Sequence, residues 1–283
     1  MSIGWDARGR DLLQGPAPRV MGIVNATPDS FSDGGRWFSA EAAVEHGLAL
    51  VEAGADILDV GGESPRPGAD VVPAAEEIRR VVPVVERLAA TGVPISIDTM
   101  KPEVAREATA AGAVVINDVS GLRDEAMAEV AVDSQAAVVV MHMQGTPQTM
   151  QVDPRYEDVV EEVVAYLEGR VAWCTARGIP RNRIAVDPGI GFGKTDEHNL
   201  ALLRNLRRLD GLAGPVVLGV SRKGVLKTMT GRSLHDRLTG SVVCSLAGCT
   251  LGARVVRVHD VGAMVDAIKV WGLLKGWGSE DGI

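Results

Sequence analysis

The chain has 283 residues, of which 29 are Lys or Arg and 37 are Asp or Glu, so its formal net charge is −8. An acidic chain without a basic run is a poor match for a phosphate backbone, which argues against nucleic acid as a partner. Hydrophobic residues make up 46% and charged residues 23%, as in ordinary globular domains, which excludes a disordered or fibrous chain.

Neither a membrane span nor a secretory signal is visible. The longest unbroken apolar run covers residues 136–141, whereas a spanning helix needs about 18 apolar residues. The first 20 residues lack the apolar segment of a signal peptide. The three cysteines, Cys174, Cys244 and Cys249, show no C-x-x-C spacing, so we expect free structural thiols. These features favour a cytoplasmic protein with no membrane partner.

Eight short and almost wholly apolar runs alternate with longer helical patterns between about residue 19 and residue 275. Such runs are typical of parallel strands that are buried on both faces. The expected strands cover residues 19–25, 56–60, 95–98, 114–117, 137–141, 184–187, 216–219 and 255–258.

The helical patterns lie between these runs. The clearest covers residues 157–177, where valines form a single stripe. Ser39 is expected to cap a helix over residues 40–53, which Gly54 ends. A last helix is expected over residues 261–275. The eightfold alternation has no linker, so it predicts one domain over residues 1–283, of the α/β class: a single (β/α)8 TIM barrel. An open doubly wound sheet is the alternative.

Polar residues follow nearly every expected strand, where a barrel builds its active site. They are Asn25, Glu63, Asp98, Asn117, His142, Asp187, Ser221, Lys223, Arg257 and His259. Some would only cap helices, but a full ring exceeds what capping requires. The carboxylates and amides suit a heterocycle with donors and acceptors, and the basic residues suit an anion.

Three glycine-containing loops follow strands. Residues 187–195 end in Gly-Lys-Thr but lack the first glycine of a phosphate loop, so nucleotide hydrolysis is not expected. Residues 61–68 must be a loop because of their prolines, and Arg66 between them would meet an anion or lie solvated at the rim. Residues 25–35 resemble an active-site lid, although an ordinary connection looks the same in sequence.

These loops and strand ends carry eight motifs in order: NATPDSFSDGG (25–35), GGESPRPG (61–68), SIDT (96–99), NDVSG (117–121), MHMQG (141–145), DPGIGFGK (187–194), SRK (221–223) and RVHD (257–260). Together they resemble the motif set of the dihydropteroate synthases over about residues 20–270. The resemblance implies a transferase of folate biosynthesis that joins 6-hydroxymethyl-7,8-dihydropterin pyrophosphate to p-aminobenzoate. It implies a homodimer, with Mg²⁺ as cofactor.

The resemblance also implies roles for individual residues. The pterin would be held by Asp98, Asn117, Asp187 and Lys223, in a slot lined by Met141, Phe192 and Gly219. The pyrophosphate would contact Asn25, Arg257 and His259, with Asn25 also a ligand of Mg²⁺. The p-aminobenzoate pocket, where sulfonamides would compete, would be formed by Arg66, Pro67, Phe192, Lys223 and Gly224. The expected catalytic residues are Asp33, Arg66, Asp98, Asp187, Lys223, Arg257 and His259. Loss of pyrophosphate would leave a pterin-methyl cation, which favours a dissociative displacement.

Two positions depart from the family pattern, both on the p-aminobenzoate side. Pro65 stands where the family usually has threonine, and Gly224 where a serine is common. A weakened paralogue that binds pterin without making dihydropteroate is therefore an alternative. A corrinoid-dependent methyltransferase barrel would share the acidic pocket but not the motifs at residues 66–68 and 221–223. An unrelated phosphate-binding isomerase barrel would need no motif at Asn25.

Overall fold

The computed structural model describes residues 4–27, 40–64 and 71–275. Its central element is a closed barrel of parallel strands in the order β10-β3-β4-β5-β6-β7-β8-β9. The strands are β3 (Arg19–Asn25), β4 (Ile57–Gly61), β5 (Ile95–Asp98), β6 (Val115–Asp118), β7 (Ala137–Met141), β8 (Ile184–Asp187), β9 (Val216–Leu218) and β10 (Ala253–Val258). The (β/α)8 barrel is therefore confirmed, and the open sheet is excluded. Four of the eight expected strands agree with the structure residue for residue.

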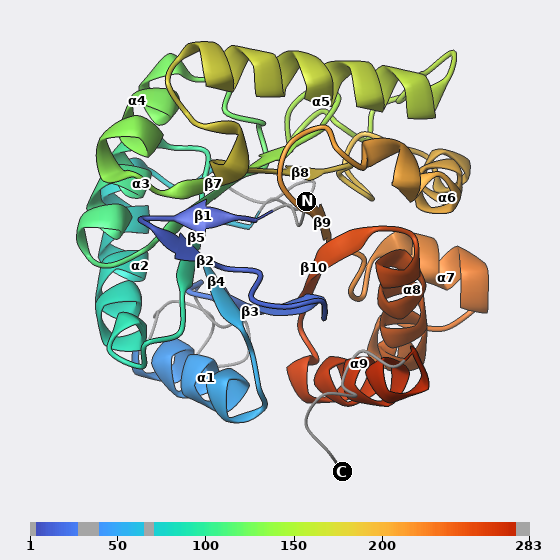
Figure 1. The fold of residues 1–283 in the computed structure, drawn as a ribbon, viewed down its shortest axis with the longest axis horizontal. Coiled ribbons are helices and arrows are strands. Elements are labelled where there is room, and N and C mark those ends of the chain that lie inside the picture. The colour runs from blue at the N-terminus through green and yellow to red at the C-terminus, as the bar shows by residue number, and fades with distance from the viewer. Residues whose placement is uncertain (1–3, 28–39, 65–70, 276–283) are drawn as a thin grey trace.

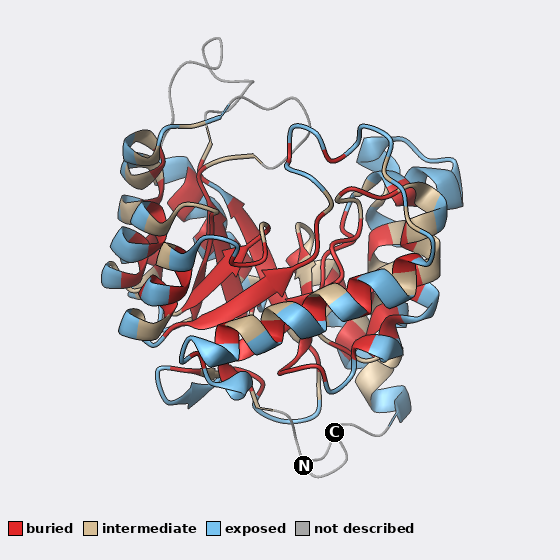
Figure 2. Ribbon diagram, turned by 90° about the horizontal axis from the view of Figure 1, so that it is seen from above, coloured by how far each residue is buried: buried red, intermediate tan, exposed pale blue. Residues whose placement is uncertain are grey.

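Helices surround the barrel (Figure 1). They are α1 (Ala40–Glu52), α2 (Ala74–Ala89), α3 (Pro102–Ala110), α4 (Glu125–Ser134), α5 (Val159–Ala176), α6 (Asp196–Arg204), α7 (Gly224–Thr230), α8 (Leu238–Thr250) and α9 (Val261–Lys275). Short 3-10 helices lie between some of these elements: η1 (Arg181–Arg183), η2 (Leu206–Leu209) and η3 (Leu234–Asp236). Figure 2 shows the strands as a buried centre and the helices exposed on their outer faces.

Helix ends follow local rules. Gly54 has a φ of +93°, a left-handed conformation that glycine adopts without strain, and it ends α1 as expected. The expected cap Ser39 lies outside the described residues. Asp158 caps α5 by accepting hydrogen bonds from the main-chain N–H groups of Val160 and Glu161.

Alternate strand residues point to opposite sides of the sheet and build two apolar layers. The larger layer lies between the strands and the helices. The smaller one fills the lower half of the barrel and includes Met21, Ile57, Val139 and Val255. A barrel of this size is filled by side chains rather than hollow, so only its upper end is left for polar chemistry.

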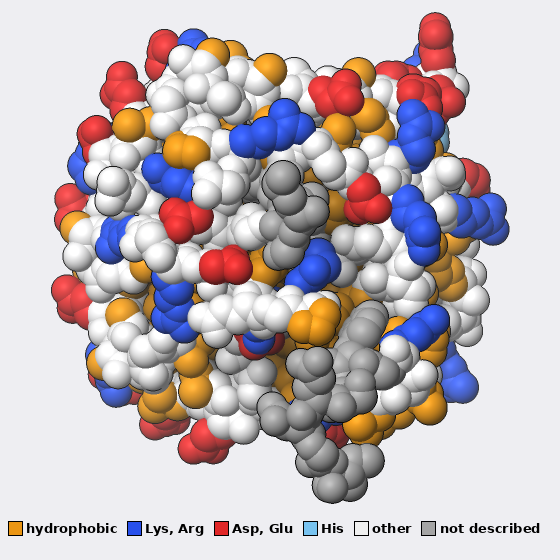
Figure 3. Space-filling view, in the orientation of Figure 1, with side chains coloured by type: hydrophobic (Ala, Val, Ile, Leu, Met, Phe, Trp, Pro, Cys, Tyr) orange, Lys and Arg blue, Asp and Glu red, His pale blue; other side chains and the backbone are white. Residues whose placement is uncertain are grey.

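A short N-terminal hairpin closes the floor of the barrel, which we did not expect from the sequence. Strands β1 (Asp6–Ala7) and β2 (Arg10–Asp11) pair antiparallel. Trp5 beside them is completely buried in the lower apolar layer, and its Nε1 donates to the carbonyl of Arg183 at 3.3 Å. Figure 1 looks onto this hairpin, and Figure 3 shows that charged side chains of both signs are spread over the same face.

Across the described ranges, no helix is long and apolar enough to cross a membrane. The three cysteines are free, as expected, and burial raises the pKa of each thiol.

Candidate active site

The polar strand ends meet at the upper rim of the barrel. The register aligns them pair by pair: Asn25 with Gly61, Gly61 with Asp98, Asp98 with Asn117, and Met141 with Asp187. Because all strands run parallel, their carboxyl ends share one face, which is where barrel enzymes place their catalytic groups.

Arg257 connects the carboxylates on one side of this rim. Its Nε lies 2.5 Å from Asp59 Oδ2, and its Nη2 lies 2.6 Å from Asp98 Oδ2. Asn117 Nδ2 donates to the same Asp59 oxygen at 3.1 Å. Asp59, Asp98 and Asn117 are all buried, so a single guanidinium compensates two carboxylates in a region that excludes water.

Burial and pairing shift the protonation of these groups in opposite ways. Burial is the largest influence on the pKa of Asp98 and raises it to about 7, because a carboxylate loses its hydration there, while Arg257 acts against this. The pKa of Arg257 is raised, because Asp59 and Asp98 outweigh the burial that would lower it. Arg257 is therefore always charged, while Asp98 ionises near neutral pH.

Asp59 belongs to the site, although none of the eight sequence motifs includes it. It lies inside β4 rather than after it, with completely apolar neighbours in the strand. A charged residue within a strand that is buried on both faces must have a partner. The position of Asp59 inside such a strand could therefore have indicated from the sequence that it belongs to a polar site. Its partner Arg257 is 198 residues away in sequence.

The other side of the rim combines Asp187, Lys223 and Phe192. Lys223 Nζ donates to the carbonyl of Ile190 and lies 4.6 Å from the centre of the Phe192 ring. Burial lowers the pKa of Lys223 to about 8, and Asp187 opposes that shift. Burial raises the pKa of Asp187, against the effect of Lys223. This half of the site thus holds one carboxylate and one ammonium that influence each other, and the ammonium lies beside an aromatic face.

Lys194 shapes the loop that carries Phe192. Its ammonium group is buried and hydrogen-bonds to the carbonyls of Gly189 and Phe192 at 3.0 and 2.9 Å and to His142 Nδ1 at 2.9 Å. A Cβ on Gly189 would lie 1.9 Å from the His142 carbonyl, so only glycine fits there. This lysine, at the end of the apparent phosphate motif, therefore serves the fold of the loop. Burial lowers the pKa of His142 to about 3, which keeps its ring neutral.

His259 and Gly219 complete this part of the rim. Ser221 Oγ lies 3.0 Å from His259 Nδ1 and accepts a hydrogen bond from the His259 main-chain N–H at 3.2 Å. A Cβ on Gly219 would lie 3.8 Å from Lys223 Nζ and 3.9 Å from Arg257 Cβ, so this glycine lies directly between the two basic residues. Asn25 ends β3 and is exposed.

A methionine-rich wall borders the site. Met141 belongs to a buried cluster with Val119, Met143 and Met150, and Phe192 packs against it. Met141 and Phe192, which we expected to line one slot, therefore share one apolar surface. Gly224 is exposed, and a Cβ there would have no atom within 4 Å. Asp33, Pro65, Arg66 and Pro67 lie outside the described residues.

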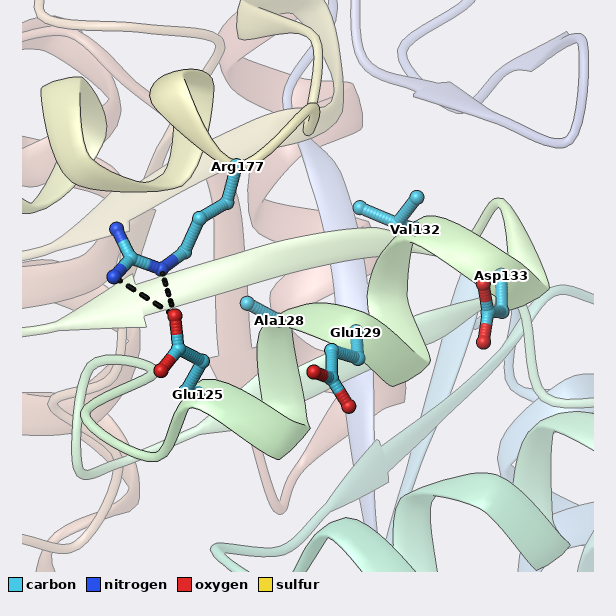
Figure 4. A pocket seen from close by; sticks show the side chains of 6 residues that line it. All are labelled: Glu125, Ala128, Glu129, Val132, Asp133 and Arg177. Atoms are coloured by element: carbon cyan, nitrogen blue, oxygen red, sulfur yellow. Dashed lines mark hydrogen bonds and ion pairs between the residues drawn. The ribbon is translucent and has the colours of Figure 1, made fainter.

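A separate surface cavity of about 360 Å³ lies between α4 and the end of α5. Figure 4 shows Glu125 paired with Arg177, with Glu129 and Asp133 farther along α4. These side chains are solvent-exposed or half-exposed and make no contact with the rim, so the cavity is not part of the polar site.

The fold and this site define the class of protein. Residues 21–259 match the family described as pterin binding enzyme. The chain is 48% identical to the dihydropteroate synthase of Neisseria meningitidis serogroup B over 274 residues, which cover 94% of this chain and 96% of that protein. A structure of Xanthomonas albilineans dihydropteroate synthase with 4-aminobenzoic acid superposes with a TM-score of 0.89 at 49% identity, covering 97% of this chain and 99% of the other.

A second structure of the Xanthomonas albilineans enzyme, in complex with 7,8-dihydropteroate, gives a TM-score of 0.84 at 45% identity, with 97% and 99% of the two chains covered. The chain thus belongs to the dihydropteroate synthase family of pterin-binding enzymes, which are transferases. The family expected from the ordered motifs is confirmed.

Proposed function

We propose that this chain condenses 6-hydroxymethyl-7,8-dihydropterin pyrophosphate with p-aminobenzoate to give 7,8-dihydropteroate and pyrophosphate. The observation that carries the proposal is one barrel rim that joins two buried acidic subsites, at Asp98 and Asp187, with the basic groups Arg257 and Lys223. The acidic subsites suit the ring donors and acceptors of a pterin, and the basic ones suit its pyrophosphate.

The reaction breaks the C–O bond between the pterin methylene and pyrophosphate and forms a C–N bond to the arylamine, which then loses a proton. Pyrophosphate leaves with the electron pair of the C–O bond, so positive charge develops on the pterin. Asp187 is buried within the electrostatic influence of Lys223, and its carboxylate would stabilise that charge in a low-dielectric site. Arg257 and His259 would receive the departing anion. We therefore favour a dissociative displacement.

We also propose that Asn25 is the protein ligand of Mg²⁺. The described residues contain no group of three or more His, Cys, Asp or Glu side chains that could hold a metal ion. Mg²⁺ usually keeps several waters and binds one or two protein oxygens together with substrate phosphates, and the exposed amide of Asn25 fits such a role. When bound, the ion would neutralise charge on the pyrophosphate.

The first experiment is an assay of the purified protein with Mg²⁺, both substrates and mass detection of dihydropteroate. We expect product from the native protein and a loss of kcat/KM of about a hundredfold or more in Asp187→Asn. Asp56→Asn is the matched control, because Asp56 pairs with Arg19 at the opposite end of β3. Pterin binding without product would favour the weakened paralogue, and Pro65→Thr would then be the variant to test for gain of activity.

Positional isotope exchange tests the dissociative step. A pterin pyrophosphate with ¹⁸O in the bridging position should scramble the label in the absence of p-aminobenzoate, because a cation and bound pyrophosphate can recombine. Scrambling that requires p-aminobenzoate, or none at all, would indicate a concerted displacement. Sulfonamides resemble p-aminobenzoate, so we expect them to inhibit competitively with it.

We propose a homodimer through α8 and α9. The two helices are in contact, and α9 turns Val261, Met264 and Ile268 inward. Apolar side chains of both helices remain exposed: Val243 of α8 and Val270, Leu273 and Leu274 of α9 are 59 to 75% exposed. Neighbouring exposed apolar residues are typical of subunit interfaces. Sedimentation should give a dimer mass, and Val243→Glu with Leu273→Glu should give a monomer. A native monomer at micromolar concentration would contradict the proposal.

We further propose that the protein works in the cytoplasm. Three free thiols, of which Cys174 and Cys249 are buried, suit a reducing compartment. Cell fractionation with an antibody to the native protein would test this placement.

A further inference from the structure

Behind Asp98 lies a cluster of three charged side chains that the proposed reaction does not use. Glu77 comes from α2, Glu63 from the segment after β4, and Lys101 from the residue before α3. Lys101 Nζ lies 2.5 Å from Glu77 Oε2 and also contacts Glu63 Oε2. Two carboxylates share one ammonium, so the cluster carries a net negative charge when both are ionised.

One oxygen of this cluster lacks a partner. Glu77 is completely buried, and among the described residues its Oε1 has no hydrogen-bond partner. A buried unpaired carboxylate oxygen is costly, so it needs a hydrogen-bond donor such as a water molecule. A small cavity of about 20 Å³ lies beside it, and Glu77 and Asp98 both line this cavity. That volume suffices for one water molecule, whose minimum is about 10 to 15 Å³.

Asp98 is surrounded by more negative than positive charge. The negative groups that act on it are Asp59 of β4, Glu77 of α2 and Asp118 of β6, and the positive groups are Arg257 of β10 and Lys223 before α7. Glu63 lines the same cavity as Asp98, and Lys101 contacts Glu63. Arg257 already serves Asp59, so it does not fully compensate Asp98. The charges of Asp59, Glu77 and Asp118 therefore favour the protonated form of Asp98.

We propose that Glu77 is a positioning residue for the reaction: across the small cavity that both residues line, its negative charge keeps a proton on Asp98, so that Asp98 meets the pterin as a hydrogen-bond donor. The inference rests on the proposed function, in which Asp98 binds the pterin ring. Arg257 occupies Asp98 Oδ2, so the proton lies on Oδ1. A dihydropterin offers ring acceptors beside its N–H donors, and a neutral Asp98 satisfies an acceptor that a carboxylate would leave unpaired.

The test is the pH dependence of binding of 6-hydroxymethyl-7,8-dihydropterin, measured by calorimetry between pH 5 and 9. This probe lacks phosphate groups that would titrate in the same range. In the native protein binding should weaken as the pH rises and Asp98 loses its proton. In Glu77→Gln the midpoint should move to lower pH by about one unit, because a neighbouring negative charge has been removed.

Two further variants make the result specific. Lys101→Met removes the ammonium, so the midpoint should move in the opposite direction, to higher pH, by about one unit. Glu76→Gln is the matched control: it removes a carboxylate from the adjacent residue of the same helix, where Glu76 pairs with Arg79 and Arg80 on the outside. Its midpoint should equal that of the native protein.

The outcomes separate the two proposals. No binding by the native protein at any pH would overturn the proposed function and this inference with it. Normal binding with the same midpoint in Glu77→Gln and Lys101→Met would overturn the role of Glu77 alone. A purely structural role would weaken binding equally at every pH, whereas opposite displacements of the midpoint in these two variants would support the effect of Glu77 on the Asp98 proton. If Glu77→Gln does not fold, the midpoint of binding in Lys101→Met tests the proposal: a move to higher pH supports it, and an unchanged midpoint overturns it.

Discussion

The floor and the rim of the barrel each hold an arginine, but they give it different partners. At the floor, Arg183 donates to the main-chain carbonyls of Ala131 and Ala136. At the rim, Arg257 donates to the carboxylates of Asp59 and Asp98. Carbonyl partners are neutral and fixed by the chain, whereas carboxylate partners titrate and can exchange a contact with a substrate. The floor is therefore built for stability and the rim for binding.

The largest expected difference follows from replacing these two arginines by methionine. Arg257→Met leaves two buried carboxylates without a counter-charge, so the free energy of unfolding should fall by about 3 to 5 kcal/mol. Its kcat/KM should fall about a thousandfold, because the anion also loses its donor. Arg183→Met leaves only neutral carbonyls unpaired and should cost about 1 to 3 kcal/mol, with kcat/KM unchanged. Urea denaturation and the dihydropteroate assay check both; equal activity losses would remove the distinction between floor and rim.

Removal of the tryptophan at the floor should affect stability alone. Trp5 is completely buried in the lower apolar layer, at the end of the barrel opposite the rim. Trp5→Ala should lower the free energy of unfolding by about 3 to 5 kcal/mol, since it creates a cavity. KM for both substrates should remain native in the folded fraction. Trp173→Ala is the control and should cost less, because Trp173 is only half-buried, beside Arg170 of α5 and Arg177, the residue after that helix. A raised KM in Trp5→Ala would show that the floor also positions the rim.

Acid should destabilise the rim through His142. Its pKa lies at about 3 in the folded protein and near 6.5 in an unfolded chain. Because the folded pKa is lowered, the stabilisation is complete above pH 6.5 and is lost as the pH falls toward 3. This residue should contribute a loss of about 1.4 kcal/mol for each pH unit below 6.5. His142→Asn should flatten the slope of unfolding free energy against pH by that amount. An unchanged slope in His142→Asn would refute the assignment.

The smallest effect is expected at Gly224, where we expect a departure from the family pattern. A Cβ has open space at this position, so Gly224→Ser should change the free energy of unfolding by less than about 1 kcal/mol. If the added hydroxyl contacts the carboxylate of p-aminobenzoate, KM for p-aminobenzoate should fall about fivefold, the value of one hydrogen bond. KM for the pterin substrate is the internal control. An unchanged KM for p-aminobenzoate would show that Gly224 lies away from that pocket.

Local sequence predicts the elements of this barrel well. The strands at Arg19–Asn25, Ala137–Met141 and Ile184–Asp187 and the helix at Val261–Lys275 have the expected bounds. A strand buried on both faces needs an uninterrupted apolar run, and a helix against it needs a stripe, so burial leaves a pattern in neighbouring residues. The rim positions of Asp98, Asn117, Asp187, Lys223 and Arg257 follow from the same reasoning, while their roles stay predictions.

Contacts between distant segments left no such pattern. Trp5 looks like any tryptophan near a terminus until the hairpin closes the floor, and Lys194 looks like part of a failed phosphate motif until it is seen among loop carbonyls. Asp59 needed Arg257, which closure of β10 against β3 brings across the barrel. The periodicity of apolar residues predicts which residues are buried, because burial alternates along each strand or helix. It does not predict the partner of a buried charge, because that partner lies on another strand and is brought near only when the sheet closes into a barrel.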